Sequence, residues 1–283
     1  MKSKLIPLLC ITLHLCAQGA WAQVPDGSDM HLPRTPFRLQ SRAEVQLPPA
    51  VDNSTRKFFP PVLDQMGGSC AQASGIGYMF TYEINRLLDR DAHASADHRF
   101  SYQFSWNLLN DGQDQGDFVD QGLYLSERYG IMTEQDYGIS GTYQFKWATG
   151  YDKYYKALQY RTQEVLTFAD SIPLMKRWLY DAGDGSAVGG VLTFSAMSRG
   201  WDIDDDYQGP SLTGYRSLLK GLATDGAHAL TIAGYDDTVV YTDAQGTPHT
   251  GAFIVVNSWG THSHDRGRFY LPYDFFRDAR VPE

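Results

Sequence analysis

Three stretches of the chain carry residue types that could perform nucleophilic catalysis. Cys70 follows a Gly-Gly-Ser run, His228 opens an apolar run that ends in Gly-Tyr, and Asn257 ends another apolar run before Ser-Trp-Gly. A cysteine thiolate is a strong nucleophile. A histidine can take and return its proton, and an amide oxygen can fix the histidine tautomer by accepting from Nδ1–H. These three residues are therefore the candidate catalytic group.

The sequence around Cys70 predicts a helix that begins at the thiol. The Gly pair allows a tight turn, Ser69 is a candidate N-cap, and Gln72 completes a capping-box pattern with it. A residue in the first helical turn lies beside unpaired N–H groups and the positive end of the helix dipole. We therefore expect the pKa of Cys70 to be lowered and its thiolate to be favoured.

Cysteine usage is unusual for an exported chain. Cys10 and Cys16 belong to the N-terminal segment, and Cys70 is the third and last cysteine. Secreted proteins normally pair their thiols, so an unpaired one is a buried inert residue, an intermolecular bridge or a reactive group. The local sequence favours the reactive group.

The first 22 residues have the features of a secretory signal. Lys2 and Lys4 precede the apolar run 5–15, and Ala-Trp-Ala at 20–22 fits a cleavage site. A membrane anchor would need a longer run, and a lipoprotein would need a small residue before Cys16, where Leu15 stands. We expect a mature chain that begins at Gln23, with no membrane contact, in the periplasm or the medium.

Charge makes nucleic acid a poor partner. The formal net charge is −9, and removal of two lysines and no acid with residues 1–22 would take it to −11. An acidic chain repels phosphate backbones. The composition, 42% hydrophobic and 20% charged, is that of a globular protein with room for one large core or two lobes.

Hydrophobic periodicity predicts helices first and strands later, an α+β order with two lobes. Residues 23–57 are an N-terminal arm or short pro-segment that docks on the body. The residues expected to form a buried stripe on the first helix, from Ser69 to about Asp89, are Ile76, Met79, Phe80, Ile84, Leu87 and Leu88. The other predicted helices are Tyr102–Leu109, Phe118–Tyr129 and Ile172–Ala182. The predicted strands are Ala187–Phe194, His228–Tyr235, Val239–Tyr241, Ala252–Val256 and Arg268–Leu271, with a hairpin connection at 243–249.

Together these motifs resemble the papain-like cysteine peptidases of the papain/cathepsin type over residues 58–276, and we expect a bacterial secreted member of that family. The stretches 129–137 and 207–209 add to the resemblance. It implies a two-lobe α+β fold, with a helical lobe over about 58–165, an antiparallel barrel-like lobe over about 166–283, and a peptide-binding cleft between them. No cofactor or metal is implied, and a monomer is favoured.

The resemblance also implies roles for individual residues. Cys70 would be the nucleophile, His228 its acid/base partner and Asn257 the residue that orients the histidine, while Gln65 and the backbone of Cys70 would bind the oxyanion. The expected substrate contacts are Gly116, Asp117 and Trp259.

Several features depart from the family pattern. Gln65 lies five residues before Cys70, one fewer than expected, and Ser263 stands where a second tryptophan is expected to shield the Asn–His bond. His228 follows Cys70 by 158 residues, against about 130–150 in papain and the cathepsins, so the chain carries insertions. The family's disulfides are absent, and residues 23–57 are too short for its large inhibitory propeptide.

Three other functions remain open. A papain-like amidase or an acyl transferase would use the same thiol chemistry, and a secreted binding protein could carry a dead site. The third motif, Asn-Ser-Trp-Gly, argues against the amidase. Two weaker patterns, a metal site at 262–265 and a calcium loop at 202–206, are interpreted as a solvated loop and a solvated acidic loop.

Overall fold

Helices dominate the first half of the chain and strands the second, as the sequence predicted. The structure, a computed structural model, describes residues 9–13, 34–39, 45–111, 113–138, 148–168, 171–243 and 246–278. The helices are η1 (Asn53–Thr55), α1 (Cys70–Gln72), η2 (Ala73–Phe80), α2 (Thr81–Leu88), η3 (Ala96–His98), α3 (Tyr102–Asn110), α4 (Val119–Tyr129), α5 (Tyr151–Ala157), α6 (Ile172–Asp181) and α7 (Tyr273–Asp278).

The strands form one open sheet. They are β1 (Leu9–Leu13), β2 (Arg34–Pro36), β3 (Ala50–Asp52), β4 (Glu164–Thr167), β5 (Leu192–Met197), β6 (Asp202–Asp204), β7 (Leu218–Gly221), β8 (Ala227–Thr242), β9 (Pro248–Val256) and β10 (Arg268–Pro272). Their order is β2-β4-β1-β5-β8-β9-β10-β7-β6, and β3 pairs with β8. The pairs β5–β8, β8–β9 and β9–β10 are antiparallel. The sheet does not close, so the barrel-like description from the sequence is too strong.

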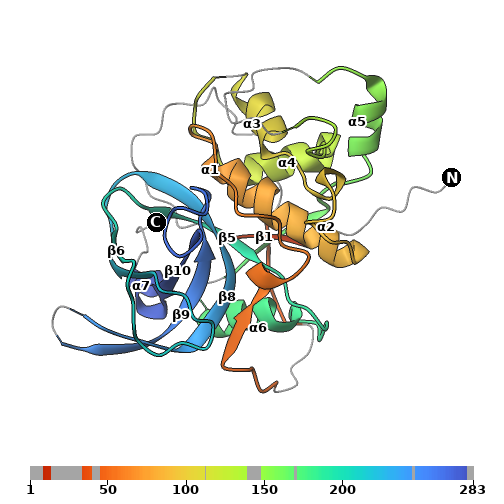
Figure 1. The fold of residues 1–283 in the computed structure, drawn as a ribbon. Coiled ribbons are helices and arrows are strands. Elements are labelled where there is room, and N and C mark those ends of the chain that lie inside the picture. Colours follow the sequence, from red (N-terminus) through yellow and green to blue (C-terminus); the bar gives the residue numbers. More distant parts are fainter. Residues whose placement is uncertain are drawn as a thin grey trace.

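In the described part of the chain, three hydrophobic clusters of buried residues underlie the two lobes. Figure 1 shows α3, α4 and α5 on one side, β6, β8, β9 and β10 on the other, and the helix formed by α1, η2 and α2 between them. One core joins this helix to α3 and α4. A second joins α6 to the strands, with Trp178 and Phe253 fully buried in it. A third, smaller cluster includes Ile254 of β9 and Tyr270 of β10. The predicted α+β class is therefore confirmed.

The central helix differs from the sequence prediction in two ways. Its segment η2 is a π-helix, a wider winding that shifts the 3.6-residue periodicity. Leu87 and Leu88, predicted to belong to the buried stripe, are 41% and 37% exposed. The helix ends immediately after them at Asp89, whose φ of 52° is left-handed. The last turn thus extends beyond the core that the earlier stripe residues fill.

Two predicted strands also have different limits. The strand predicted from Ala187 begins only at Leu192, because Gly190 lies against α6. A Cβ on Gly190 would lie 2.3 Å from the ring of Trp178, and its N–H donates to the carbonyl of that residue. The two predicted strands at 228–235 and 239–241 are one strand, β8, with irregular register opposite β9.

The central helix lies directly on the sheet because small residues line the contact. On β8, Ala229 and Ala233 belong to the same core cluster as the helix. Between them, Thr231 shares a buried hydroxyl cluster with Ser74 of the helix: Ser74 Oγ lies 2.9 Å from Thr231 Oγ1 and 2.5 Å from Thr193 Oγ1 on β5. These contacts join the lobes.

Tyr78 connects the helix to the two loops that approach the predicted site. Its buried hydroxyl accepts from the backbone N–H of Leu63 at 2.7 Å and donates to the carbonyl of Asn257 at 2.9 Å. The chain around Leu63 also pairs with the chain after Asn257, since the N–H of Gly260 donates to the Leu63 carbonyl at 2.9 Å. One buried side chain therefore fixes both loops.

The described parts of the N-terminal segment lie on the body. Strand β2 pairs with β4, and β3 pairs with β8. Asn53 is fully buried and donates through Nδ2 to the carbonyls of Leu179 and Gly190 at 2.8 and 2.9 Å. The structure therefore has no break at the predicted boundary of residue 58. Most of the predicted signal segment lies outside the described residues; its residues 9–13 form β1, between β4 and β5.

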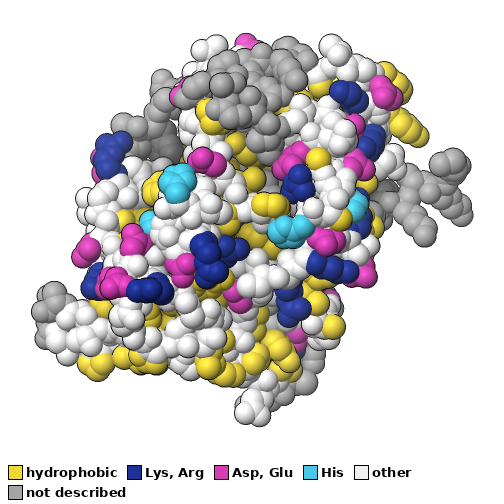
Figure 2. Space-filling model, viewed as in Figure 1, with side chains coloured by type: hydrophobic (Ala, Val, Ile, Leu, Met, Phe, Trp, Pro, Cys, Tyr) yellow, Lys and Arg dark blue, Asp and Glu magenta, His cyan; other side chains and the backbone are white. Residues whose placement is uncertain are grey.

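Among the described residues, no helix has both the length and the apolar character needed to cross a bilayer. On the face drawn in Figure 2, basic and acidic side chains alternate over the surface without a large area of one sign.

The substitution Tyr78→Phe should lower the free energy of unfolding by about 1–3 kcal/mol, because it leaves a buried N–H and a buried C=O without their partner. Urea unfolding measures the change. Tyr151→Phe is the matched control, since Tyr151 is 83% exposed and its loss of a hydroxyl should change stability by less than about 0.5 kcal/mol. Equal stabilities for the two variants would contradict the role given to Tyr78.

Candidate active site

Cys70 begins the central helix, and a tight glycine turn precedes it. Gly67 has a φ of 53°, which favours glycine. A Cβ on Gly68 would lie 3.0 Å from the carbonyl carbon of Gln115 and from the backbone N of Gly116. The Gly pair therefore serves a left-handed turn and a close approach between two loops.

The predicted capping box does not form. Ser69 makes no side-chain cap; its Oγ donates to the carbonyl of Met66 at 2.6 Å. The amide of Gln72 points elsewhere and donates to Asp117 Oδ1 and to the carbonyl of Phe118, both at 3.1 Å. The start of the helix therefore keeps its backbone N–H groups for the thiol, and those of Cys70 and Ala71 stabilise its anion.

His228, at the start of β8, is 5% exposed and hydrogen-bonded to a fully buried amide. Its Nε2 lies 2.8 Å from Asn257 Oδ1, where the sequence argument expected Nδ1 to make this bond. The ring of Trp259 stacks on the imidazole, with centroids 4.7 Å apart and an angle of 21°. Since the oxygen of Asn257 accepts, Nε2 carries the proton and Nδ1 is the free basic nitrogen.

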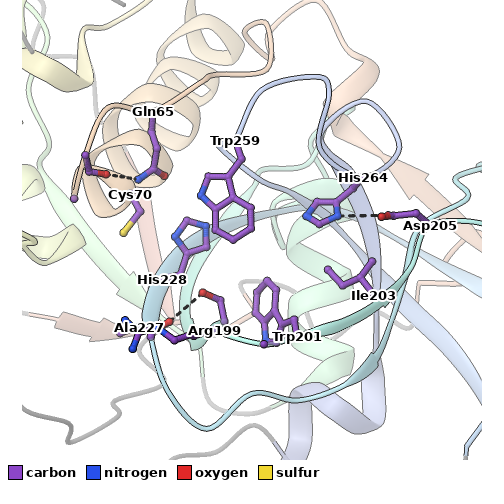
Figure 3. Close-up of a pocket in the computed structure, with 15 residues that line it drawn as sticks. Gln65, Cys70, Arg199, Trp201, Ile203, Asp205, Ala227, His228, Trp259 and His264 are labelled. Atoms are coloured by element: carbon purple, nitrogen blue, oxygen red, sulfur yellow. Dashed lines mark hydrogen bonds and ion pairs between the residues drawn. The ribbon is translucent and has the colours of Figure 1, made fainter. Parts of the chain in front are cut away.

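Cys70, His228, Trp259 and Gln65 line one cavity of about 690 Å³. Figure 3 shows the sulfur of Cys70 beside the imidazole of His228, with Trp259 covering the other face of the ring. The backbone N–H of Ala229, the residue after the histidine, interacts with the Cys70 sulfur. The structure thus brings together the predicted nucleophile, base and orienting residue, although they span 187 positions of the chain.

Burial governs the protonation of the pair. It raises the pKa of the Cys70 thiol to about 11, against the opposing effect of the backbone N–H groups of Ala229, Ala71 and Cys70. Burial also lowers the pKa of His228 to about 4, although the hydrogen bond to Asn257 opposes this. Burial therefore outweighs the lowering of the thiol pKa that the helix terminus was expected to produce.

Gln65 lies beside the thiol and is tied to the Asn257 loop. Its Oε1 accepts from Ser258 Oγ at 2.5 Å, and its backbone N–H donates to the carbonyl of Ser258 at 2.7 Å. Its Nε2 donates one N–H to the carbonyl of Gly67 at 2.9 Å. A primary amide has a second N–H, so the bond to Gly67 uses only one of the two donors of this cavity-lining group.

The predicted substrate contacts occupy different environments. Trp259 lines the cavity. Gly116 is exposed, and a Cβ there would meet nothing within 4 Å. Asp117 is only 8% exposed and accepts from Gln72 at Oδ1 and from Asn110 at Oδ2. Burial raises the pKa of Asp117 to about 7, and its charge raises the pKa of the thiol. It is placed to influence Cys70 and not to line the cavity.

One residue of this site was missed by sequence reasoning. His264 lies against Asn257, with its Nε2 3.3 Å from Asn257 Nδ2, whereas the sequence interpretation placed it in a solvated loop. The only sequence signal was Ser263. It stands where a tryptophan was expected to shield the Asn–His bond, so another side chain could occupy that place. In the part of the chain that the structure describes, no group of three or more His, Cys, Asp or Glu side chains could hold a metal ion.

Comparison with known proteins identifies the fold. No protein-family model and no curated protein matches the chain. Xylellain, a cysteine protease from Xylella fastidiosa, is 20% identical, with a TM-score of 0.59 over 86% of each chain. Digestive procathepsin L2 proteinase from Tenebrio molitor larval midgut is 17% identical, with a TM-score of 0.55 over 88% of this chain and 71% of that one. The chain has the papain-like fold that its motifs predicted.

The rate at which iodoacetamide alkylates Cys70 should rise with pH between 6 and 9, about tenfold per unit, because the thiolate fraction of a group with a raised pKa rises in that way. Peptide mass spectrometry assigns the modified cysteine. Asp117→Asn should raise the rate above about pH 7 and change it little at pH 6, because burial raises the pKa of Asp117 to about 7 and only the ionised carboxylate disfavours the thiolate. A rate that is flat from about pH 5 to 9 would mean a preformed thiolate–imidazolium pair and would contradict the raised pKa of the Cys70 thiol.

Proposed function

We propose that the chain is a cysteine peptidase that hydrolyses peptide bonds through Cys70, His228 and Asn257. The observation that carries the proposal is the hydrogen bond from His228 Nε2 to Asn257 Oδ1, which leaves Nδ1 basic in the cavity that Cys70 shares. A nucleophile beside a base that a third group orients is the arrangement required for covalent acyl transfer. The papain-like fold adds to this support.

The proposed mechanism uses Cys70 as the nucleophile and His228 as the carrier of its proton. As Cys70 Sγ attacks the scissile carbonyl carbon, its proton passes to His228 Nδ1, and the carbonyl oxygen becomes an oxyanion. The imidazolium then donates that proton to the leaving amine, and an acyl thioester remains on Cys70. Water, deprotonated by His228, attacks the thioester and releases the acid, and the thiol recovers its proton.

The oxyanion would be stabilised by donors already present at the start of the helix. We assign this role to the backbone N–H of Cys70 and to the second N–H of Gln65 Nε2. Removal of one such donor costs about 10²–10³ in kcat in other acyl-transfer enzymes. Gln65 also holds Ser258, so its loss would disturb the Asn257 loop as well.

We further propose that the chain acts outside the cytoplasm, in the periplasm or medium, on peptide or protein substrates. The basic start, apolar run and Ala-Trp-Ala site of residues 1–22 support export. The acidic net charge supports the exclusion of nucleic acid as a partner.

Cleavage of a mixed-peptide substrate should fall to background in Cys70→Ala and by about 10²–10⁴ in His228→Ala, because the nucleophile and the general base are lost. Liquid chromatography with mass spectrometry measures the products. His93→Ala is the matched control, since His93 is exposed and remote from the cavity. Hydrolysis products define a peptidase, whereas transfer to an added amine would define an acyl transferase. Full binding of peptide without turnover would contradict the proposal and favour a binding protein.

A further inference from the structure

His264 occupies the side of Asn257 opposite His228. The Asn257 amide therefore lies between two imidazoles: its Oδ1 is 2.8 Å from His228 Nε2, and its Nδ2 is 3.3 Å from His264 Nε2. Oδ1 also accepts from the backbone N–H of Ser258 at 2.8 Å. The backbone N–H of Ser258 requires an acceptor and therefore fixes the oxygen on the His228 side, which leaves the nitrogen on the His264 side.

We propose that His264 is a positioning residue: its neutral Nε2 accepts from Asn257 Nδ2 and keeps the amide oxygen directed at His228. This inference rests on the proposed peptidase function. His264 touches no reacting atom, and it acts through Asn257. An asparagine whose nitrogen faced His228 would present a donor to the N–H of Nε2, and the tautomer that leaves Nδ1 basic would be lost.

The backbone conformation of His264 supports a functional role for this residue. Its φ is 52°, in the left-handed region that non-glycine residues adopt rarely and at a cost. The ring stays in place by packing against Phe269, with centroids 5.1 Å apart, and near Trp259, at 6.2 Å. A strained residue held by such contacts beside the candidate active site is where functional constraint is expected.

The surroundings favour the required tautomer. Nδ1 of His264 lies 3.5 Å from Asp205 Oδ1 (Figure 3), whereas the other ring nitrogen, Nε2, is the one near Asn257. The carboxylate favours a proton on Nδ1, which leaves Nε2 as the acceptor. Asp205 is itself held by Ser217 Oγ at 2.6 Å.

Protonation of His264 would oppose the same geometry. Its Nε2 would then carry an N–H facing the NH₂ of Asn257, and its charge would oppose proton uptake by His228. The charged groups that face it are Asp205, which favours protonation, and His228, while Trp259 and Phe269 supply apolar faces. Burial lowers the pKa of His264, so the neutral acceptor is the form present near neutral pH.

Two substitutions separate the hydrogen bond from the fold. His264→Asn suits the left-handed backbone but is too short to reach Asn257, and we expect kcat to fall about tenfold with KM changed less than twofold. His264→Gln keeps an acceptor that cannot be protonated, and we expect kcat within about threefold of the parent. In the pH profile of kcat, the acid limb of His264→Gln should be shallower than that of the parent and lie at lower pH. His262→Gln, at an exposed neighbour, is the control and should match the parent.

An active parent whose kcat and pH profile are unchanged in His264→Asn would overturn the inference. Nitrogen-15 spectra of histidine side chains supply a second readout that needs no turnover. We expect His264 to have a protonated Nδ1 and an unprotonated Nε2 near neutral pH, with its signals assigned by their loss in His264→Gln. A protonated Nε2 would overturn the inference even in a parent that cleaves no peptide, whereas inactivity of the parent contradicts only the proposed function.

Discussion

The contact between the central helix and strand β8 is the constraint on which the site depends, because the thiol belongs to one lobe and the imidazole to the other. Small residues let the helix lie on the sheet, and the hydroxyl of Ser74 bonds to Thr193 and Thr231 within the interface. Tyr78 then ties the loop before Cys70 to the backbone of Asn257. Loss of this packing would separate nucleophile and base without touching either.

Protonation at the site follows from that packing. The interface that brings Cys70 and His228 together also limits their contact with water, which disfavours the charged form of each. The Asn257 amide compensates by fixing where protons can reside, with its oxygen toward His228 and its nitrogen toward His264. Cys70 and His228 can thus exchange a proton within the site.

Hydrophobic periodicity predicted the α+β class, and the resemblance of the three motifs to the papain-like family implied that three distant residues share one site. The sequence did not predict the features that depend on tertiary packing. The π-helical winding of η2 and the exposure of Leu87 and Leu88 depend on neighbours. The Cys70 pKa depends on burial, which a helix-terminus argument omits. The position of His264 depends on its left-handed backbone conformation, and no sequence pattern predicts that conformation at a residue that is not glycine.

The most direct test of the account is the intact mass of the purified protein after exposure to an epoxide inhibitor of papain-like enzymes, with His228→Ala measured beside it. The account predicts one adduct on Cys70 in the parent and none in the variant, because the epoxide needs both an accessible sulfur and the imidazole proton relay. A folded parent that forms no adduct, or a His228→Ala variant that reacts as fast as the parent, would contradict an assembled Cys70–His228 pair.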